Sequence, residues 1–241
     1  MTFDRDVPGW ERVAAGVLRC RLPVWDCTVG LVTGTGGALL VDAGSSLREG
    51  ARVRAEAQAL AGRRVTHLAL THPHFDHVLG AAVFAGAEVF AAVGPPAAWS
   101  AEGLRTDAVR HGLDEREAAW AADTLVRPGH EVSGELVLDL GGGREAVLVN
   151  AGPGHTAQDL AVLIPGDPPV VFCGDLVEES GAPQAGPDAV PSRWPAALDR
   201  LLALGGADAR YVPGHGAVVD AAFVRAQRDA LAARFGVSHR P

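Results

Sequence analysis

The sequence predicts an α/β fold that occupies residues 1–241 as a single domain. Short apolar runs rich in Val, Leu and Ala alternate with longer helical stretches along the whole chain. No proline- or glycine-rich linker separates two independent apolar segments. With 241 residues, of which 48% are hydrophobic, the chain is long enough to bury a large core. We therefore expect one soluble globular α/β domain.

Both halves of the chain run from strands into a mixture of strands and helices. In the first half, strands are expected at residues 17–22, 28–33, 38–42, 65–70 and 88–92. The helices of that half are expected at residues 47–60, 77–84 and in an Ala-rich stretch from 99 to 124. In the second half, strands are expected at residues 135–140, 145–150, 160–164, 170–173 and 211–212. Two helices, at 195–204 and 221–235, complete the prediction.

Two glycine- and proline-containing segments fit loops of this fold. The "GGG" at 141–143 is typical of a hairpin turn between two strands. Residues 178–195 contain four prolines and no clear hydrophobic period, which predicts a long irregular loop. Long loops in compact domains often shape a binding site, so this loop and the insertion near 99–120 are expected to wall the pocket.

Charge and residue usage exclude several classes of function. The net charge of −8 lacks the basic stripe that a nucleic-acid partner requires. The chain contains no lysine, which excludes Schiff-base chemistry, Ser-Lys dyads and a Walker A phosphate loop. Cys20, Cys27 and Cys173 match no C-x-x-C spacing, so we expect neither a disulfide framework nor a thiolate zinc site.

The hydropathy pattern gives no sign of a membrane partner. No apolar run is long enough to span a bilayer, and the first ten residues, "MTFDRDVPGW", contain no hydrophobic export segment. We therefore expect a cytoplasmic protein. The oligomeric state is left open.

The stretch "THPHFDHVLG" at residues 71–80 carries the strongest chemical signal. An apolar strand should lead into it, and Pro73 favours an extended backbone at His72, so His72 and His74 can project to the same side. Asp76 and His77 follow where the chain turns into a helix and can reach a second point nearby. Imidazole and carboxylate are the ligands that zinc accepts, whereas a solvated turn is the simpler alternative.

Three further candidates follow the same pattern later in the chain. His155 lies in "AGPGHT", Asp175 in "VVFCGDL" and His215 in "YVPGHG". Each follows an apolar run and sits beside a glycine, which is typical of ligands delivered from strand ends where the backbone comes close. Together with the four residues above, they make seven candidate ligands, which is enough for two ions.

In this order, the His-x-His-x-Asp-His, Gly-His-Thr, Gly-Asp and Gly-His motifs resemble the metallo-β-lactamase fold superfamily. "LLVDAG" at 39–44 matches the early Val-Asp-x-Gly turn of that superfamily, and the resemblance extends over residues 13–235. It implies a four-layer αβ/βα sandwich of two mixed β-sheets flanked by helices. It also implies an enzyme that acts on a small molecule.

The resemblance assigns the candidate ligands to two metals. His72, His74 and His155 would hold the first metal, and three further side chains would hold the second. Those three are Asp76, His77 and His215. Asp175 would bridge the two metals.

Further residues are expected around the ligands. Asp42, Thr71 and Thr156 would orient ligand imidazoles. Glu178, Arg193 and Trp194 are candidates for the pocket wall, and they could equally be a core tryptophan and solvent-facing charges.

The implied reaction is hydrolysis with two Zn²⁺ ions, with Fe or Mn as other metals that such ligands accept. A hydroxide bridging the ions would be the nucleophile, and Asp76 is the candidate catalytic residue that shuttles a proton to the leaving group. An acidic bridge at Asp175 is similar to the glyoxalase II, lactonase and phosphodiesterase-like branches, whereas β-lactamases have cysteine or serine at the comparable place. An ester, thioester or lactone substrate is therefore favoured.

Several alternatives stay open at this point. The few residues after His215 do not suffice for the glutathione-binding domain of a standard glyoxalase II. Tyr211, the only tyrosine, does not match the tyrosine that lactonases place near the metals. A mononuclear iron oxidoreductase similar to persulfide dioxygenases is the first alternative. β-Lactamase activity, phosphodiesterase activity and a binding protein that has lost its chemistry are the others.

Overall fold

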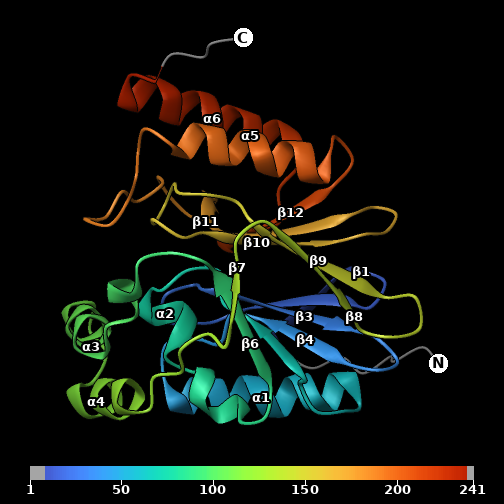
Figure 1. The fold of residues 1–241 in the computed structure, drawn as a ribbon, viewed down its shortest axis with the longest axis vertical. Coiled ribbons are helices and arrows are strands. Elements are labelled where there is room, and N and C mark those ends of the chain that lie inside the picture. Colours follow the sequence, from blue (N-terminus) through green and yellow to red (C-terminus); the bar gives the residue numbers. More distant parts are fainter. Residues whose placement is uncertain (1–8, 238–241) are drawn as a thin grey trace.

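The computed structural model describes residues 9–237, which form two mixed β-sheets with helices on both outer sides (Figure 1). The layers follow one another as helix α1, first sheet, second sheet and helices α5 and α6. This is the four-layer sandwich that the sequence resemblance implied, so the predicted fold class is confirmed. Residues 1–8, which include most of the segment used to predict the absence of an export signal, lie outside the described residues.

The first sheet has seven strands in chain order and is antiparallel up to β4 and parallel from there to β7. Its strands are β1 (Trp10–Ala14), β2 (Val17–Arg21), β3 (Thr28–Thr33), β4 (Ala38–Val41), β5 (His67–Ala69), β6 (Glu88–Ala92) and β7 (His130–Val132). The parallel half matters for function, because the loops that follow β4 and β5 leave the sheet at the same edge.

The second sheet has five strands in the order β12-β11-β10-β9-β8, with one parallel pair, β11 and β12. Its strands are β8 (Glu135–Asp139), β9 (Glu145–Asn150), β10 (Leu160–Ile164), β11 (Val170–Glu178) and β12 (Arg210–His215). The "GGG" segment forms the turn between β8 and β9, as predicted, with positive φ at all three glycines.

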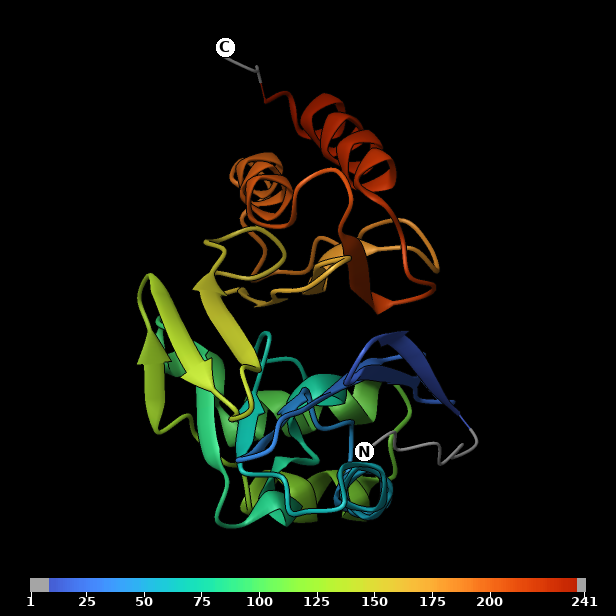
Figure 2. The same ribbon diagram turned by 90° about the vertical axis from the view of Figure 1, so that its right-hand side faces the viewer.

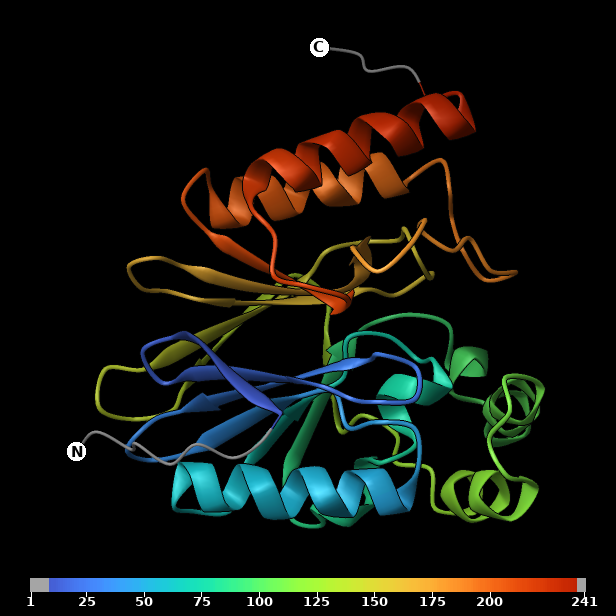
Figure 3. The same ribbon diagram turned by 180° about the vertical axis from the view of Figure 1, so that it is seen from behind.

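Helices close the two outer sides of the sandwich. Helix α1 (Leu47–Ala61) covers the first sheet, as seen from behind in Figure 3. Helices α5 (Trp194–Gly205) and α6 (Ala221–Phe235) lie side by side over the second sheet (Figure 2). Helix α1 begins where the Ser46 side chain accepts a hydrogen bond from the Glu49 amide, and it ends at Gly62 with φ of +66°.

The core between the sheets brings residues of β3 and β4 against residues of β9, β10 and β11. Its packing is close enough to require a glycine at residue 30, because a Cβ there would lie 2.3 Å from Cε1 of Phe172. Two further apolar clusters pack the first sheet against α1 and its neighbours, and the second sheet against α5 and α6. This packing fixes the position of the two sheets relative to each other, and with it the edge where their loops meet.

The structure corrects two of the expected helices. Residues 77–84 form a short α2 (Phe75–Val78) followed by a 3₁₀ turn, Ala81–Phe84. Gly80 separates them and packs on the backbone, since a Cβ there would lie 2.0 Å from the Ala43 carbonyl oxygen. The expected helix at 99–124 is divided into α3 (Ala101–Arg110) and α4 (Glu115–Asp123), because Asp114 caps a new helix.

Candidate metal centre

The seven candidate ligands converge at one edge of the sandwich. His72 and His74 follow β5, and the short helix α2 carries Asp76 and His77. The other three come from the second sheet and are His155 in the β9–β10 loop, Asp175 within β11 and His215 at the end of β12. Both sheets therefore contribute side chains to the same cluster.

Two groups of ligand atoms in the cluster share Asp175, and a third group beside them consists of Cys27, Asp76 and His77. Ligand atoms of His72, His74, His155 and Asp175 all lie within 4.8 Å of one another. Ligand atoms of His77, Asp175 and His215 do so as well. Asp175 belongs to both groups, as a bridging carboxylate would.

The carboxylate of Asp175 lies at the centre of the cluster. Its Oδ2 is 3.6 Å from His72 Nε2, 3.4 Å from His155 Nε2 and 3.3 Å from His215 Nε2, whereas its Oδ1 is 3.2 Å from His77 Nε2. Glycine at residue 214 makes this position accessible, because a Cβ there would lie 1.8 Å from Asp175 Oδ1. Strand β12 can therefore pass directly beside the carboxylate.

Asp76 and His74 complete the two groups from opposite sides. Asp76 Oδ2 lies 3.4 Å from His215 Nε2 and 3.6 Å from His77 Nε2. His74 Nδ1 lies 3.0 Å from His155 Nε2. Imidazole and carboxylate groups that lie this close together are typical of a metal site, because one cation can bind several of them at once.

Three buried atoms in the cluster have no hydrogen-bond partner among residues 9–237. They are His72 Nε2, His77 Nε2 and Asp175 Oδ1. Leaving such polar atoms buried and unpaired costs about 1–3 kcal/mol each, unless another group satisfies them. The three atoms point into the same space, so this set of nitrogen and carboxylate donors fits one or more divalent ions.

The outer nitrogens of the histidines are held by hydrogen bonds. Asp42 Oδ2 lies 2.8 Å from His77 Nδ1 and accepts a hydrogen bond of 2.8 Å from Thr71 Oγ1, and Thr71 Oγ1 lies 2.9 Å from His72 Nδ1. Asp42 Oδ1 also accepts from the Thr71 amide. Asp42 and Thr71 were expected to orient ligand imidazoles, and both contact imidazoles of the candidate ligands.

Three outer contacts were not anticipated from the sequence. The Gln184 carbonyl oxygen lies 3.1 Å from His155 Nδ1, and the Trp25 carbonyl oxygen lies 2.8 Å from His215 Nδ1. Asp188 Oδ2 lies 3.0 Å from His74 Nε2. Gln184 and Asp188 belong to the loop between β11 and α5, which the sequence analysis expected near the site. With these contacts, one nitrogen of every candidate histidine faces the cluster while the other is held from outside.

Burial and neighbouring charges set the protonation states of the cluster. Burial, reinforced by neighbouring imidazoles, lowers the pKa of His72 well below its usual value and that of His155 to about 4. Burial opposes ionisation of Asp175, but the four surrounding histidines outweigh it and hold the pKa of that carboxyl well below its usual range. Burial also opposes protonation of His74, His77 and His215, but neighbouring negative groups outweigh it and raise the pKa of all three, that of His215 to about 9. A metal ion binds the neutral imidazole and the ionised carboxylate, so binding would displace such protons.

Four other predicted residues lie around the cluster without joining it. Thr156 donates its amide and hydroxyl hydrogens to Asp159, and burial raises the pKa of Asp159 to about 7. Glu178 accepts hydrogen bonds from the Ser180 amide and hydroxyl. The other two, at the start of α5, differ in exposure. Trp194 is fully buried, with its ring 5.4 Å from that of the candidate ligand His155, whereas Arg193 is exposed.

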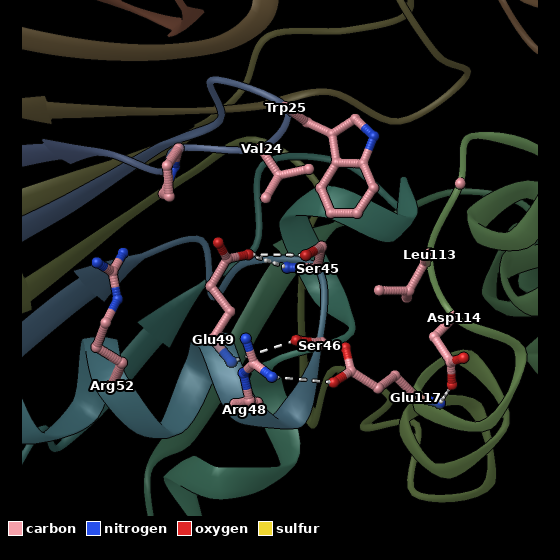
Figure 4. A pocket seen from close by; sticks show the side chains of 12 residues that line it. Val24, Trp25, Ser45, Ser46, Arg48, Glu49, Arg52, Leu113, Asp114 and Glu117 are labelled. Carbon is pink, nitrogen blue, oxygen red and sulfur yellow. Dashed lines mark hydrogen bonds and ion pairs between the residues drawn. The ribbon is translucent and has the colours of Figure 1, made fainter.

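Two cavities in residues 9–237 contain none of the seven candidate ligands. The larger, of about 440 Å³, lies between the β2–β3 loop, the start of α1 and the α3–α4 connection (Figure 4). Its wall includes Trp25, whose ring packs edge-on against Phe75 of α2 at 5.2 Å. Part of the expected insertion at 99–120 therefore lines this separate cavity.

The sequence profile of the metallo-beta-lactamase superfamily matches residues 22–215, which includes the whole cluster. The chain belongs to this superfamily. The predicted family resemblance is thereby confirmed, and the members of this superfamily are mostly hydrolases.

Two curated relatives of the superfamily match part of the chain. Metallo-beta-lactamase domain-containing protein 1 of Xenopus laevis is 31% identical over 158 residues, which is 65% of this chain and 56% of the relative. Hydroxyacylglutathione hydrolase of Nitrosococcus oceani is 32% identical over 155 residues, which is 64% of this chain and 49% of the relative. The chain thus spans about half the length of the curated relatives it matches.

Solved structures of the superfamily share the fold at low identity. A metallo-beta-lactamase from Pontibacter korlensis is 21% identical with a TM-score of 0.68 and covers 92% of this chain and 97% of its own. A metallo-beta-lactamase from Hirschia baltica is 16% identical with a TM-score of 0.64, with coverage of 92% and 96%. In the described part of the chain, none of the helices has the length and hydropathy needed to cross a membrane.

Proposed function

We propose that the protein is a dinuclear metal-dependent hydrolase of a small ester, thioester or lactone. The observation that carries this proposal is the position of Asp175, which belongs to two adjacent groups of ligand atoms. The first ion would be held by His72, His74 and His155. The other would be held by three residues on the opposite side of Asp175, namely Asp76, His77 and His215.

Two bound divalent ions would supply a water of near-neutral pKa and would polarise the substrate carbonyl oxygen. The residues of the chain prepare that chemistry. Asp42 and Thr71 orient His77 and His72, so that Nε2 of each imidazole faces the cluster. The Asp76 carboxylate lies 3.4 Å from His215 Nε2 and 3.6 Å from His77 Nε2, and it is the candidate that carries a proton to the leaving group.

The relative named hydroxyacylglutathione hydrolase supports the choice among substrates, because its name states that it hydrolyses an acylated glutathione. This favours an ester or thioester carbonyl over a phosphodiester. Zinc is the metal that we propose, since a cluster of histidines and carboxylates suits a borderline ion. Cys27 lies beside Asp76 and His77, but burial raises the pKa of its thiol, which disfavours the thiolate form that binds metals. The cytoplasmic location, the single domain over residues 1–241 and the absence of a nucleic-acid partner stay predictions.

Metal analysis followed by a substrate panel tests this function. The purified protein should contain about two zinc ions per chain, and chelation should abolish the hydrolysis of thioesters or lactones. His74→Ala should lose both metal and turnover, whereas the control His130→Ala, an exposed histidine on β7, should keep them. Full turnover in His74→Ala would rule the proposal out, and a single iron with oxygen consumption on a persulfide would favour the oxidoreductase alternative.

Asp188→Asn should weaken the binding of one of the two ions by about 10–100-fold. The Asp188 carboxylate lies 3.0 Å from His74 Nε2, so its loss frees an imidazole whose Nδ1 faces the cluster. Competition with a chromophoric chelator measures the two affinities. The control is Asp208→Asn, an exposed aspartate between α5 and β12, which removes the same charge. Equal affinities in Asp188→Asn and Asp208→Asn would show that Asp188 does not orient His74.

A further inference from the structure

We propose that a second cavity, beside the N-terminus of α5, binds a phosphate-type oxyanion. The cavity has a volume of about 200 Å³ and lies between the turn after β9, residues 151–153, and one face of α5. Arg193, Ala196, Ala197 and Arg200 form that face. Neither the seven candidate ligands nor any acidic residue lines this cavity.

Arg200 is fixed against the floor of the cavity. Its Nη1 donates a hydrogen bond of 2.7 Å to the Ala151 carbonyl oxygen and a longer one of 3.4 Å to that of Asn150. Gly152 makes room for this arrangement, because it has φ of +82° and a Cβ there would lie 2.6 Å from Arg200 Nη1. Nη2 and Nε of Arg200 have no hydrogen bond within residues 9–237, so two donor groups stay available to a ligand.

Arg193 contributes a second guanidinium to the wall of this cavity. Its side chain is exposed and makes no hydrogen bond or ion pair within the described part of the chain. It precedes Arg200 by seven residues, which are about two helical turns, so both side chains lie on the same face of α5. Arg193 was expected in the wall of the substrate pocket, whereas the cavity that it lines contains none of the seven candidate ligands.

The charge around the cavity contrasts with that of the whole protein. The chain has a net charge of −8, yet this cavity presents two guanidinium groups and no carboxylate. Asp199, the chain neighbour of Arg200, is engaged by Arg228 at 2.6 Å and does not neutralise the pair. Helix α5 also begins without a side-chain cap, so its partial positive end adds to the attraction for an anion.

The size and the donor geometry of the cavity define the ligand class. At about 200 Å³ the space is smaller than the roughly 300–1,000 Å³ of most small-molecule sites, and it suits a single tetrahedral oxyanion. Guanidinium groups bind phosphate oxygens in pairs of parallel hydrogen bonds. The ligand is therefore inorganic phosphate or the terminal phosphate of a phosphomonoester.

This cavity adjoins the metal centre without being part of it. Its floor, residues 151–153, leads directly to His155, and Trp194, which follows Arg193, packs against the His155 ring at 5.4 Å. An anion in the cavity would contact the outer side of the loop that carries His155. The inference does not depend on the proposed hydrolase function, because it requires neither a metal ion nor turnover.

Titration with inorganic phosphate, followed by the backbone amide signals of the ¹⁵N-labelled protein, tests the proposal. Saturable shifts are expected at Gly152 and Ala196, and sodium chloride at equal ionic strength should not reproduce them. Arg193→Gln should weaken binding at least tenfold, and Arg200→Gln should do the same. The matched control is Arg127→Gln, which removes an exposed guanidinium without a side-chain partner in the described residues and should bind phosphate normally.

Arg193→Gln keeps the test decisive even if Arg200→Gln disturbs the fold, because the Arg193 side chain supports nothing else. Shifts that do not saturate, or unchanged affinity in Arg193→Gln, would overturn the proposal, and so would an equal loss in Arg127→Gln. A parallel titration with glycerol 3-phosphate distinguishes the source of the anion. Tighter binding of the ester assigns the site to a phosphorylated molecule, and tighter binding of inorganic phosphate assigns it to the free ion.

Discussion

Asp175→Ala is expected to remove metal from both halves of the cluster at once. The carboxylate lies within 3.2–3.6 Å of Nε2 of four histidines, two in each group of ligand atoms. Its loss would deprive both proposed ions of a negatively charged ligand. The metal content should fall from about two ions per chain to background, and turnover should fall at least about 10³-fold, which corresponds to about 4 kcal/mol of transition-state stabilisation.

Elemental analysis of the purified variant and steady-state hydrolysis measure this effect. Asp76→Ala is the informative comparison, because Asp76 contacts the histidines of one group alone. It should keep about one ion per chain, whereas Asp175→Ala should keep none. If Asp175→Ala retained two ions, the carboxylate would not be the bridge between them.

Asp42→Ala is expected to destabilise the metal-free protein by about 3–5 kcal/mol. Asp42 is buried and accepts hydrogen bonds from the Thr71 amide and hydroxyl, and it lies 2.8 Å from His77 Nδ1. Removing it leaves those buried groups unpaired, and that loss is more costly than the loss of an exposed contact. For a chain of this length, we expect the melting temperature to fall by about 10 °C.

The chain offers a matched control for the backbone contribution to that loss. Asp42 has φ of +62° and Asp26 has φ of +61°, so alanine is equally disfavoured at both positions. Asp26, however, makes a partly exposed ion pair with Arg21, which contributes at most about 1 kcal/mol. Calorimetry in the presence of a chelator should therefore show a much larger effect for Asp42→Ala. Equal destabilisation of the two variants would mean that the buried hydrogen bonds contribute little.

The strands and helices with a clear hydrophobic period and distinct residues at their ends were predicted correctly from the sequence. The strands at 28–33, 88–92, 145–150 and 160–164 and the helix at 221–235 begin and end as expected. Strands β1 and β7 were missed, because Glu11 and Arg12 interrupt the apolar residues of β1, and β7 has the single apolar residue Val132. Strand β11 continues to Glu178 beyond the predicted end at 173, because Gly174 and Asp175 interrupt the apolar run without ending the strand.

The part of the candidate site that could be predicted consists of side chains at fixed spacings in the sequence. His72, His74, Asp76 and His77 form such a motif, and the structure brings them together with His155, Asp175 and His215; their individual roles stay proposals. The outer contacts of Gln184 and Trp25 use backbone carbonyl groups, which every residue carries, so no pattern of residue types can reveal them. Asp188 lies in an irregular loop, where its distance from His74 depends on the course of the chain.

The division of the ligands between the two sheets has a consequence for folding. His74 and His155 are 81 residues apart in the sequence, and neither sheet alone supplies the proposed ligand set for either ion. A bound ion would therefore act as a covalent cross-link does, joining two distant parts of the chain and favouring the folded state in proportion to the logarithm of its concentration. The unfolded chain cannot present these ligands at one point, so metal supply in the cell would set how much of the protein persists as well as how much is active.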